Sequence, residues 1–321
     1  MDQTRNHIGT TAGVLLAAIA WSTYPCHGAR AQAADSGNSS PTTIVWSGME
    51  WNVKSGTGEG PGPNVWSAAN TFVDADGDLH LTIANVGGVW YCAEISSTLT
   101  FGFGTFQWQV QSAVDQLDPN VVLGLFVYGP TALGPDGTHE FDIEYSRFGS
   151  TTGDNGWWTV FPNVQVTPPL LGQSHYPLVL GVDPTTTARF AWASTNVAFE
   201  TMAGFQPAGS NASAIHSWTY RPADPSTTIC QSPMPVHMNL WLYHGSPPTN
   251  GEGAEVVIHN FSFTPSSTGP PPVTAPALAG DGRYILAACL MGLGIIWSAR
   301  ALATSRVTRF IAPRRPPSEG P

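Results

Sequence analysis

The sequence predicts an all-β domain, folded as a sandwich of antiparallel sheets, between two end segments of different composition. Charged residues make up only 11% of the chain, whereas Gly (34) and Pro (28) are abundant. Between the ends, no long segment has the 3.6-residue apolar period of an amphipathic helix. Short runs of alternating apolar and polar residues recur between turn residues instead, which is typical of half-buried strands. A domain of about 230 residues is long enough to bury one large core.

The N-terminal segment, residues 1–33, has the features of a secretory signal peptide. Arg5 and His7 precede an apolar run over residues 12–21, and Ala31-Gln32-Ala33 supplies an A-x-A cleavage site. We therefore expect the globular domain to cover residues 34–265 and to lie outside the cytoplasm, secreted or held at the cell envelope.

The first strands of the domain are predicted by alternation and by a turn. Leu79–Ile83 and Phe106–Val110 alternate apolar and polar residues. The segment 73–79 is typical of a hairpin, with Asp-Gly at its turn. Its three aspartates lack the twelve-residue frame, closing Glu and flanking helices of an EF-hand loop, which favours a turn over a metal site. We expect no metal and no cofactor, and leave a structural calcium ion undecided.

The segment His139–Tyr145 carries the strongest chemical signal. Glu140, Asp142 and Glu144 occupy every second position, so a strand would project all three from one face, with His139 on the other. Three acids on one face repel each other and contribute nothing to folding, which indicates a chemical role. The alternative is an acidic strand edge that discourages aggregation.

Glycoside hydrolysis requires two carboxyl groups that flank the scissile bond, about 5–5.5 Å apart in a retaining mechanism. On a strand, positions i and i+4 lie roughly 13 Å apart at their Cα atoms. Each extended Glu side chain recovers about 3.7 Å of that distance, so Glu140 and Glu144 fit the retaining value. Crowding should also raise at least one pKa of the set, as a general acid needs.

Several segments together resemble glycoside hydrolase family 16, the lichenase, laminarinase and xyloglucan transglycosylase group. Glu140–Glu144 resembles the family's E-[aliphatic]-D-[apolar]-E strand, with Phe141 at the aliphatic position. Phe101–Val110 and Asn120–Tyr128 resemble the strands that precede it. Met238–Trp241 is similar to the family's Met-Asn-Leu-Trp, and Ala254–Pro265 to its closing strand.

The resemblance implies a concanavalin A-like β-jelly roll, a sandwich of two antiparallel sheets whose concave sheet forms an open cleft. It implies that Glu140 is the nucleophile, Asp142 its supporting acid and Glu144 the general acid/base. No extra residue separates Asp142 from Glu144, as in the lichenase and xyloglucan branch. The segment 175–182 departs from the family, because Gly181 stands near the position of its usual Trp.

Charge and aromatic content indicate the class of ligand. Residues 34–280 contain four basic and nineteen acidic residues, a net charge near −15, which argues against nucleic acid and against acidic polysaccharides. Twelve Trp favour a neutral glycan, because apolar sugar faces stack on indole rings. For each of these residues, packing in the core is an equal alternative. The candidate sugar-binding residues are Trp157, Trp158, Trp108, Asn239 and Trp241.

Two cysteines, Cys92 and Cys230, fall within the domain. In an oxidising compartment an isolated pair favours a disulfide, but two buried free thiols fit the sequence equally well.

The C-terminal end has the composition of a membrane anchor. Residues 266–283 form a linker rich in Pro, Gly, Ser and Thr. Residues 284–303 contain an uncharged apolar run that predicts a transmembrane segment, and residues 304–321 form a basic tail that favours a cytoplasmic C-terminus. An amphipathic helix docked on the domain is the alternative. The layout resembles bacterial C-terminal sorting tags, without their Pro-Glu-Pro motif.

Together these observations predict a monomeric, retaining endo-β-glycosidase that hydrolyses a neutral polysaccharide, with a β-glucan favoured. A transglycosylase would use the same residues and pass the glycosyl group to a sugar. A non-catalytic carbohydrate-binding sandwich would share the aromatic residues, but would have no use for three aligned carboxyl groups.

Overall fold

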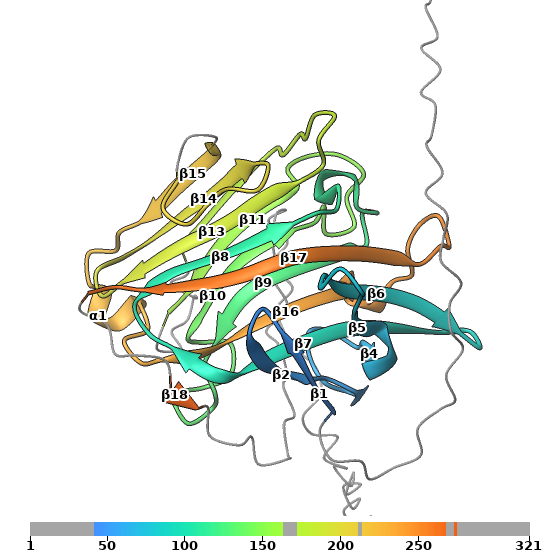
Figure 1. The fold of residues 1–321 in the computed structure, drawn as a ribbon, viewed down its shortest axis with the longest axis horizontal. Helices are drawn as coiled ribbons and strands as arrows, with labels where there is room; N and C mark the ends of the chain where they lie inside the picture. The colour runs from blue at the N-terminus through green and yellow to red at the C-terminus, as the bar shows by residue number, and fades with distance from the viewer. Residues whose placement is uncertain (1–41, 163–171, 211–213, 268–272, 275–321) are drawn as a thin grey trace, which may run out of the picture. The chain divides into compact units, whose positions relative to one another are not determined.

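The computed structural model of the protein describes residues 42–162, 172–210, 214–267 and 273–274. These residues form two antiparallel sheets stacked face to face, with the strands of the second sheet in front in Figure 1. The predicted all-β sandwich is thereby confirmed.

The first sheet contains the acidic strand as an internal strand, paired on both sides. Its order is β1 (Thr42–Trp46), β2 (Met49–Val53), β7 (Val89–Phe101), β16 (Met234–Leu242), β9 (Val121–Tyr128), β10 (Glu140–Tyr145), β11 (Gly156–Phe161) and β12 (Gly172–Tyr176).

The second sheet packs against it. Its order is β5 (Thr71–Val73), β6 (Leu79–Val86), β17 (Ala254–Pro265), β8 (Gly104–Val110), β13 (Thr186–Ala193), β14 (Asn196–Ala203) and β15 (Ala214–Tyr220). The long strand β7 pairs with β6 at its start and continues into the first sheet, so the β6–β7 hairpin joins the two sheets.

Short elements complete the described chain. They are β3 (Gly56–Thr57), β4 (Val65–Trp66), β18 (Val273–Thr274), the four-residue helix α1 (Pro225–Thr228) and single 3-10 turns at Ala68–Asn70, Val114–Gln116 and Tyr243–Gly245. Strand β18 pairs with β7, so the predicted linker 266–283 contributes one short strand to the first sheet.

The core lies between the two sheets and is rich in aromatic side chains. Strand β10 inserts Phe141, Ile143 and Tyr145, all fully buried, on the face opposite its carboxylates. The Phe141 ring meets Trp192 of the second sheet edge-on at 5.1 Å between centroids. The predicted alternation of β10 is therefore confirmed, and aromatic packing fixes which of its faces points outward.

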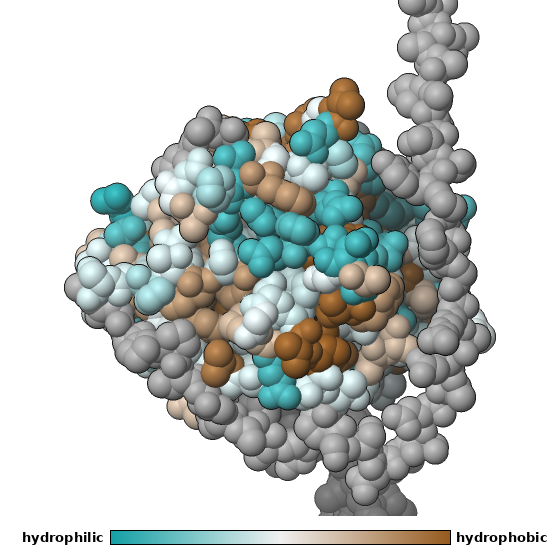
Figure 2. All heavy atoms as spheres, viewed as in Figure 1, coloured by the Kyte–Doolittle hydropathy of each residue, from teal (hydrophilic) through white to brown (hydrophobic). Residues whose placement is uncertain are grey.

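The outer face of the second sheet is largely polar, as Figure 2 shows across its middle. Arg189 of β13 donates to Glu200 of β14 through Nε (2.9 Å) and an Nη (2.6 Å). Both bonds end on Glu200 Oε2, and this charged pair orders the two strands without offering an apolar surface.

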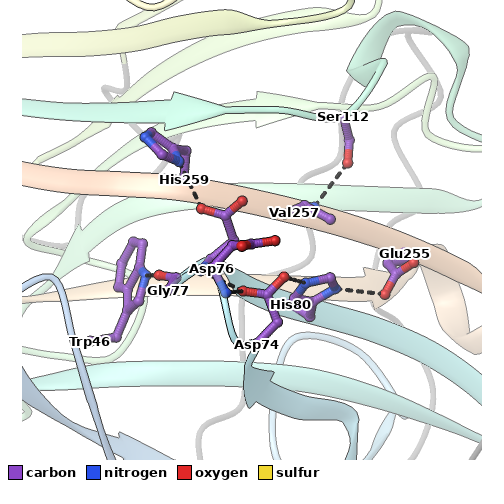
Figure 3. A network of polar contacts seen from close by, with 10 residues as sticks. Trp46, Asp74, Asp76, Gly77, His80, Ser112, Glu255, Val257 and His259 are labelled. Carbon is purple, nitrogen blue, oxygen red and sulfur yellow. Dashed lines mark hydrogen bonds and ion pairs between the residues drawn. The ribbon is translucent and has the colours of Figure 1, made fainter. Parts of the chain in front are cut away.

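The predicted hairpin at 73–79 is confirmed, and its aspartates bind protein groups (Figure 3). Asp74 accepts hydrogen bonds from the backbone amides of Asp76 (3.0 Å) and Asp78 (2.9 Å). His80 bridges Asp74 (3.2 Å) and Glu255 (2.8 Å), which ties this turn to β17. The carboxylates at this turn therefore hold two strands together.

Cys92 and Cys230 are both buried free thiols, so the structure favours the second of the two sequence alternatives. Burial raises the pKa of Cys92 to about 12 and that of Cys230 to about 11, which makes both thiols poor nucleophiles.

The predicted signal peptide (1–33), transmembrane segment (284–303) and basic tail (304–321) lie outside the described residues. Within the described part of the chain, no helix has the length and apolar character needed to cross a membrane.

Candidate active site

The three acids of β10 lie together on the outward face of the first sheet. Strand β10 pairs with β9 and β11 in continuous register, with no bulge between Asp142 and Glu144. Glu140, Asp142 and Glu144 are only 7%, 5% and 8% exposed, although they face away from the core. They line a pocket, which rules out the sequence alternative of an acidic strand edge in solvent.

The pocket encloses about 520 Å³ of empty space, part of it open to solvent. Apolar side chains and buried polar groups share its wall, the composition typical of small-molecule sites. Its lining comprises Lys54, Gly60, Pro61, Glu94, Gly124, Phe126, Tyr128, Glu140, Asp142, Glu144, His237, Asn239 and Trp241.

Burial shapes the electrostatics of the three acids. It raises the pKa of Glu144 to about 7, so Glu144 keeps its proton well above the ordinary range of a carboxyl. Burial and then the charge of Glu140 raise the pKa of Asp142 further. Burial and the charge of Glu144 raise the pKa of Glu140 to about 8, although the hydrogen bond from Asp142 opposes this rise. Among the three acids, Glu140 is the one whose ionised form is stabilised by a hydrogen bond from a neighbouring acid, Asp142.

These shifts predict a pH-dependent cost to stability. At low pH folded and unfolded chains both hold the carboxyl protons, so the cost is absent. As the pH rises from the ordinary value of 4.5 to about 7, the unfolded chain loses the Glu144 proton first and stability falls. We therefore expect Glu144→Gln to raise the melting temperature at about pH 8 and to change it much less at about pH 4. Calorimetry at both pH values tests this, and an equal difference at both would contradict it.

A second polar group forms part of the pocket wall, with Glu94 on β7, His237 on β16 and Lys54 directly after β2. The carboxylate of Glu94 is bound by Lys54 Nζ at 2.9 Å and contacts His237 Nδ1 at 3.3 Å. Burial opposes its ionisation, but the charge of Lys54 and the contact with His237 outweigh burial and lower its pKa. Glu94 is therefore a fixed anionic acceptor inside the pocket.

Asn239 of β16 lies between Glu94 of β7 and the acidic strand β10. Its Nδ2 approaches Glu94 Oε2 at 3.5 Å, and its Oδ1 has no hydrogen-bond partner among the described residues although it is buried. A Cβ atom at position 124 would meet this oxygen at 2.4 Å, so only Gly124 leaves room for the Asn239 side chain beside Glu144. An unpartnered amide oxygen in a pocket fits a ligand hydroxyl.

The predicted aromatic residues separate into two groups. Trp241 lines the pocket, and Trp157 is half-buried opposite Glu144 on the neighbouring strand. Trp158 and Trp108 are 1% and 0% exposed in the core between the sheets. The prediction that Trp158 and Trp108 bind sugar is therefore wrong, because their positions on β11 and β8 point them inward.

The loop between β9 and β10 lies beside Glu140, since the charge of its Asp136 contributes to the raised pKa of Glu140. Tyr128 faces Glu140 across the β9–β10 register and donates a hydrogen bond to Asp136 of this loop. His139 precedes β10 with a positive φ of 59° and bonds Thr138 Oγ1 at 2.7 Å. His139 does not line the pocket.

Sequence reasoning missed Glu94, Lys54 and His237. One signal was available, because Lys54 is the only lysine of the chain and lies among nineteen acids in residues 34–280. Its partners lie far along the chain, so nothing local pairs them.

No known family model matches the chain, and no curated protein matches it either. Solved structures do match the chain. A β-glucanase of Bacillus licheniformis is 20% identical, with 72% of this chain and all of that one covered at a TM-score of 0.52. This chain has the β-glucanase fold. A family 16 enzyme of a Bacteroides ovatus mixed-linkage glucan locus, in complex with G4G4G3G product, is 12% identical (67% and 94% covered, TM-score 0.52). A laminarinase of Flavobacterium is also 12% identical (66% and 92% covered, TM-score 0.51).

Proposed function

We propose that the protein is a retaining endo-β-glycosidase that hydrolyses a neutral β-glucan. The observation that carries the proposal is the row of buried carboxyl groups Glu140, Asp142 and Glu144, which line one pocket with unequal environments. Acids whose surroundings separate their proton affinities are typical of paired nucleophile and general-acid roles.

In the proposed mechanism Glu140 attacks the anomeric carbon while Glu144 protonates the leaving oxygen. Asp142 donates its hydrogen bond to Glu140 and so favours the ionised nucleophile. In the second step Glu144, now ionised, takes a proton from water as the water attacks the anomeric carbon. The bond to Glu140 breaks, and the sugar leaves with its original configuration.

A neutral β-glucan fits the pocket and the charge of the domain. Trp241 and Phe126 offer apolar surface, whereas Glu94 and Asn239 offer acceptors for hydroxyl groups. A negatively charged glycan would meet an acidic domain. The enzymes that share the fold are described as acting on β-glucans, which supports the same substrate class here.

Secretion, attachment through residues 284–303 with the enzyme domain outside, and a monomeric state remain part of the proposal. Secretion and attachment rest on the composition of the two ends.

The experiment is a screen of the full-length protein for reducing-end release from mixed-linkage β-glucan, laminarin, xyloglucan and galactan. We expect release from at least one β-glucan, with retained configuration of the first-formed product by NMR. The Glu140→Gln variant serves as the control for contaminating activity. An inverted product would contradict the retaining mechanism, and binding of these glycans without any hydrolysis would favour a non-catalytic sandwich.

A further inference from the structure

The loop of residues 129–139, which joins β9 to β10, packs around the side chain of His139. A Cβ atom on Gly129 would meet His139 Cβ at 2.7 Å, and one on Gly134 would meet His139 Nδ1 at 2.9 Å, so both positions require glycine. Thr138 Oγ1 donates its one proton to a loop carbonyl at 2.5 Å, so the ring donates the 2.7 Å bond between Nδ1 and Thr138 Oγ1. His139 therefore anchors the loop from inside.

The anchored loop holds Asp136 against a side chain of the pocket. Tyr128 of β9 lines the pocket and lies directly opposite Glu140 in the register of β9 and β10. The Tyr128 hydroxyl donates to Asp136 Oδ1 and accepts a bond from the amide of Gly137 at 3.5 Å. A phenol has one proton, so the proton that Asp136 accepts is not available to Glu140. Asp136 itself does not line the pocket.

Titratable side chains from several elements lie around Glu140. They come from its own strand, from β9, β7 and β16, and from the loop: Asp142, Glu144, Tyr128, Glu94, His237 and Asp136. Burial raises the pKa of Glu140 most, followed by the charge of Glu144, and the charge of Asp136 raises it further. Asp136 is the acid of this set that a loop holds in place, whereas strands hold the other acids.

We propose that Asp136 is a positioning residue for the nucleophile: it keeps the Tyr128 proton away from Glu140 and places a negative charge beside that carboxylate. The inference rests on the proposed function and adds to it a residue outside the pocket that controls the attack. A carboxylate that accepts a hydrogen bond from a phenol is a weaker nucleophile, and one that lies beside a second negative charge is a stronger one. Asp136 favours the attack in both ways.

The test measures the attack step on the full-length protein. A dinitrophenyl β-glucan oligosaccharide needs no proton on its leaving group, so kcat/KM on this substrate reports the attack by Glu140. Asp136→Asn removes the charge and releases the Tyr128 proton to Glu140. Because both changes stabilise ionised Glu140, the acidic limb of the pH profile should move to lower pH by roughly one unit. The plateau of kcat/KM should fall several-fold.

Three further measurements separate this role from a structural one. The inhibition constant of a non-reacting glucan oligosaccharide should be unchanged in Asp136→Asn, because Asp136 does not line the pocket. Asp136→Glu keeps the charge and the acceptor, and should keep the acidic limb near its wild-type pH. In a Tyr128→Phe background, Asp136→Asn should lower the plateau less than in the wild type, because no phenol proton is then released.

Asp183→Asn is the matched control. Asp183 also lies in a loop and accepts a hydrogen bond from a hydroxyl, that of Thr185 at 2.7 Å, but it does not line the pocket. This variant should leave the pH profile unchanged.

Two results would overturn the positioning role and leave the proposed function intact. One is an unchanged limb and plateau in Asp136→Asn, or a loss that is equal with and without the Tyr128 hydroxyl. The other is an acidic limb at higher pH in Tyr128→Phe alone, which would show that the phenol donates to Glu140 in the wild type. This second result decides the question even if Asp136→Asn fails to fold. A wild-type protein inactive on both the aryl glycoside and the glucan would instead overturn the proposed function.

Discussion

Glu140→Gln is expected to lower hydrolysis of the β-glucan by several orders of magnitude while leaving the fold and glycan binding nearly intact. Glutamine has almost the same shape as glutamate but cannot form the covalent glycosyl intermediate. It also removes one of three crowded acids, so the variant should be at least as stable as the wild type near neutral pH. Reducing-end release measures the activity, and near-UV circular dichroism measures the fold.

Glu255→Gln supplies a matched control, because this residue lies on β17 of the second sheet, where it pairs with His80. The Glu255→Gln variant should hydrolyse the glucan at the wild-type rate. Azide then tests the role of Glu140 itself. With Glu140→Gly, azide should attack in place of the carboxylate and yield a glycosyl azide of inverted configuration. An azide of retained configuration would assign the nucleophile to the other glutamate.

Glu144→Gln is expected to slow hydrolysis of a natural glucan severely and to spare the first step on an aryl glycoside with an activated leaving group. Burial raises the pKa of Glu144 to about 7, so the wild-type enzyme holds the required proton up to neutral pH. A dinitrophenolate leaves without a proton, and its release in the first turnover is therefore insensitive to this residue. A burst measurement on both substrates makes the comparison.

The pH profile gives a second readout on the same variant. On the glucan, wild-type activity should fall as the pH rises through about 7, because Glu144 loses its proton there. The three acids titrate as a set, so the fall in activity above about pH 7 reflects the ionisation of the whole group. If this fall disappears in the Glu144→Gln variant, Glu144 is the residue responsible for it. An equal loss of activity on both substrates would show that Glu144 is not the general acid.

The acidic strand was predictable because its signal is local. Period-two alternation over Glu140–Tyr145 places the acids on one face and Phe141 and Ile143 on the other, whatever the neighbouring strands are. The hairpin at 73–79 was predictable for the same reason, since Asp-Gly fixes the turn. Neither prediction requires knowledge of a distant partner.

The aromatic residues were not predictable in that way. Trp157 and Trp158 are adjacent on one strand, so only one of them can face the cleft. The choice depends on the register between β10 and β11, which pairs Trp157 with Glu144 and Trp158 with Ile143. Sequence spacing does not specify that register. Trp108 alternates correctly in its strand, but β8 belongs to the second sheet, where its inward face meets the core.

The wall formed by Lys54, Glu94 and His237 depends on the order of strands in the sheet. β7 and β16 are neighbours although the contact between Glu94 and His237 joins positions far apart in the chain. Because Glu94 and His237 are so far apart in the sequence, no local sequence pattern predicts that they are in contact. The pocket therefore combines one locally encoded strand with neighbours that only the fold brings together.

The account rests on Glu140 as the residue that becomes covalently glycosylated, and trapping of that intermediate tests it most directly. The full-length protein is incubated with a 2-fluoro dinitrophenyl β-glucan oligosaccharide, which forms the intermediate but releases it slowly. The account predicts a stoichiometric mass increase of one oligosaccharyl group, located by peptide mass spectrometry on Glu140. An adduct on a different residue, or no adduct on a protein that hydrolyses the parent glucan, would contradict it.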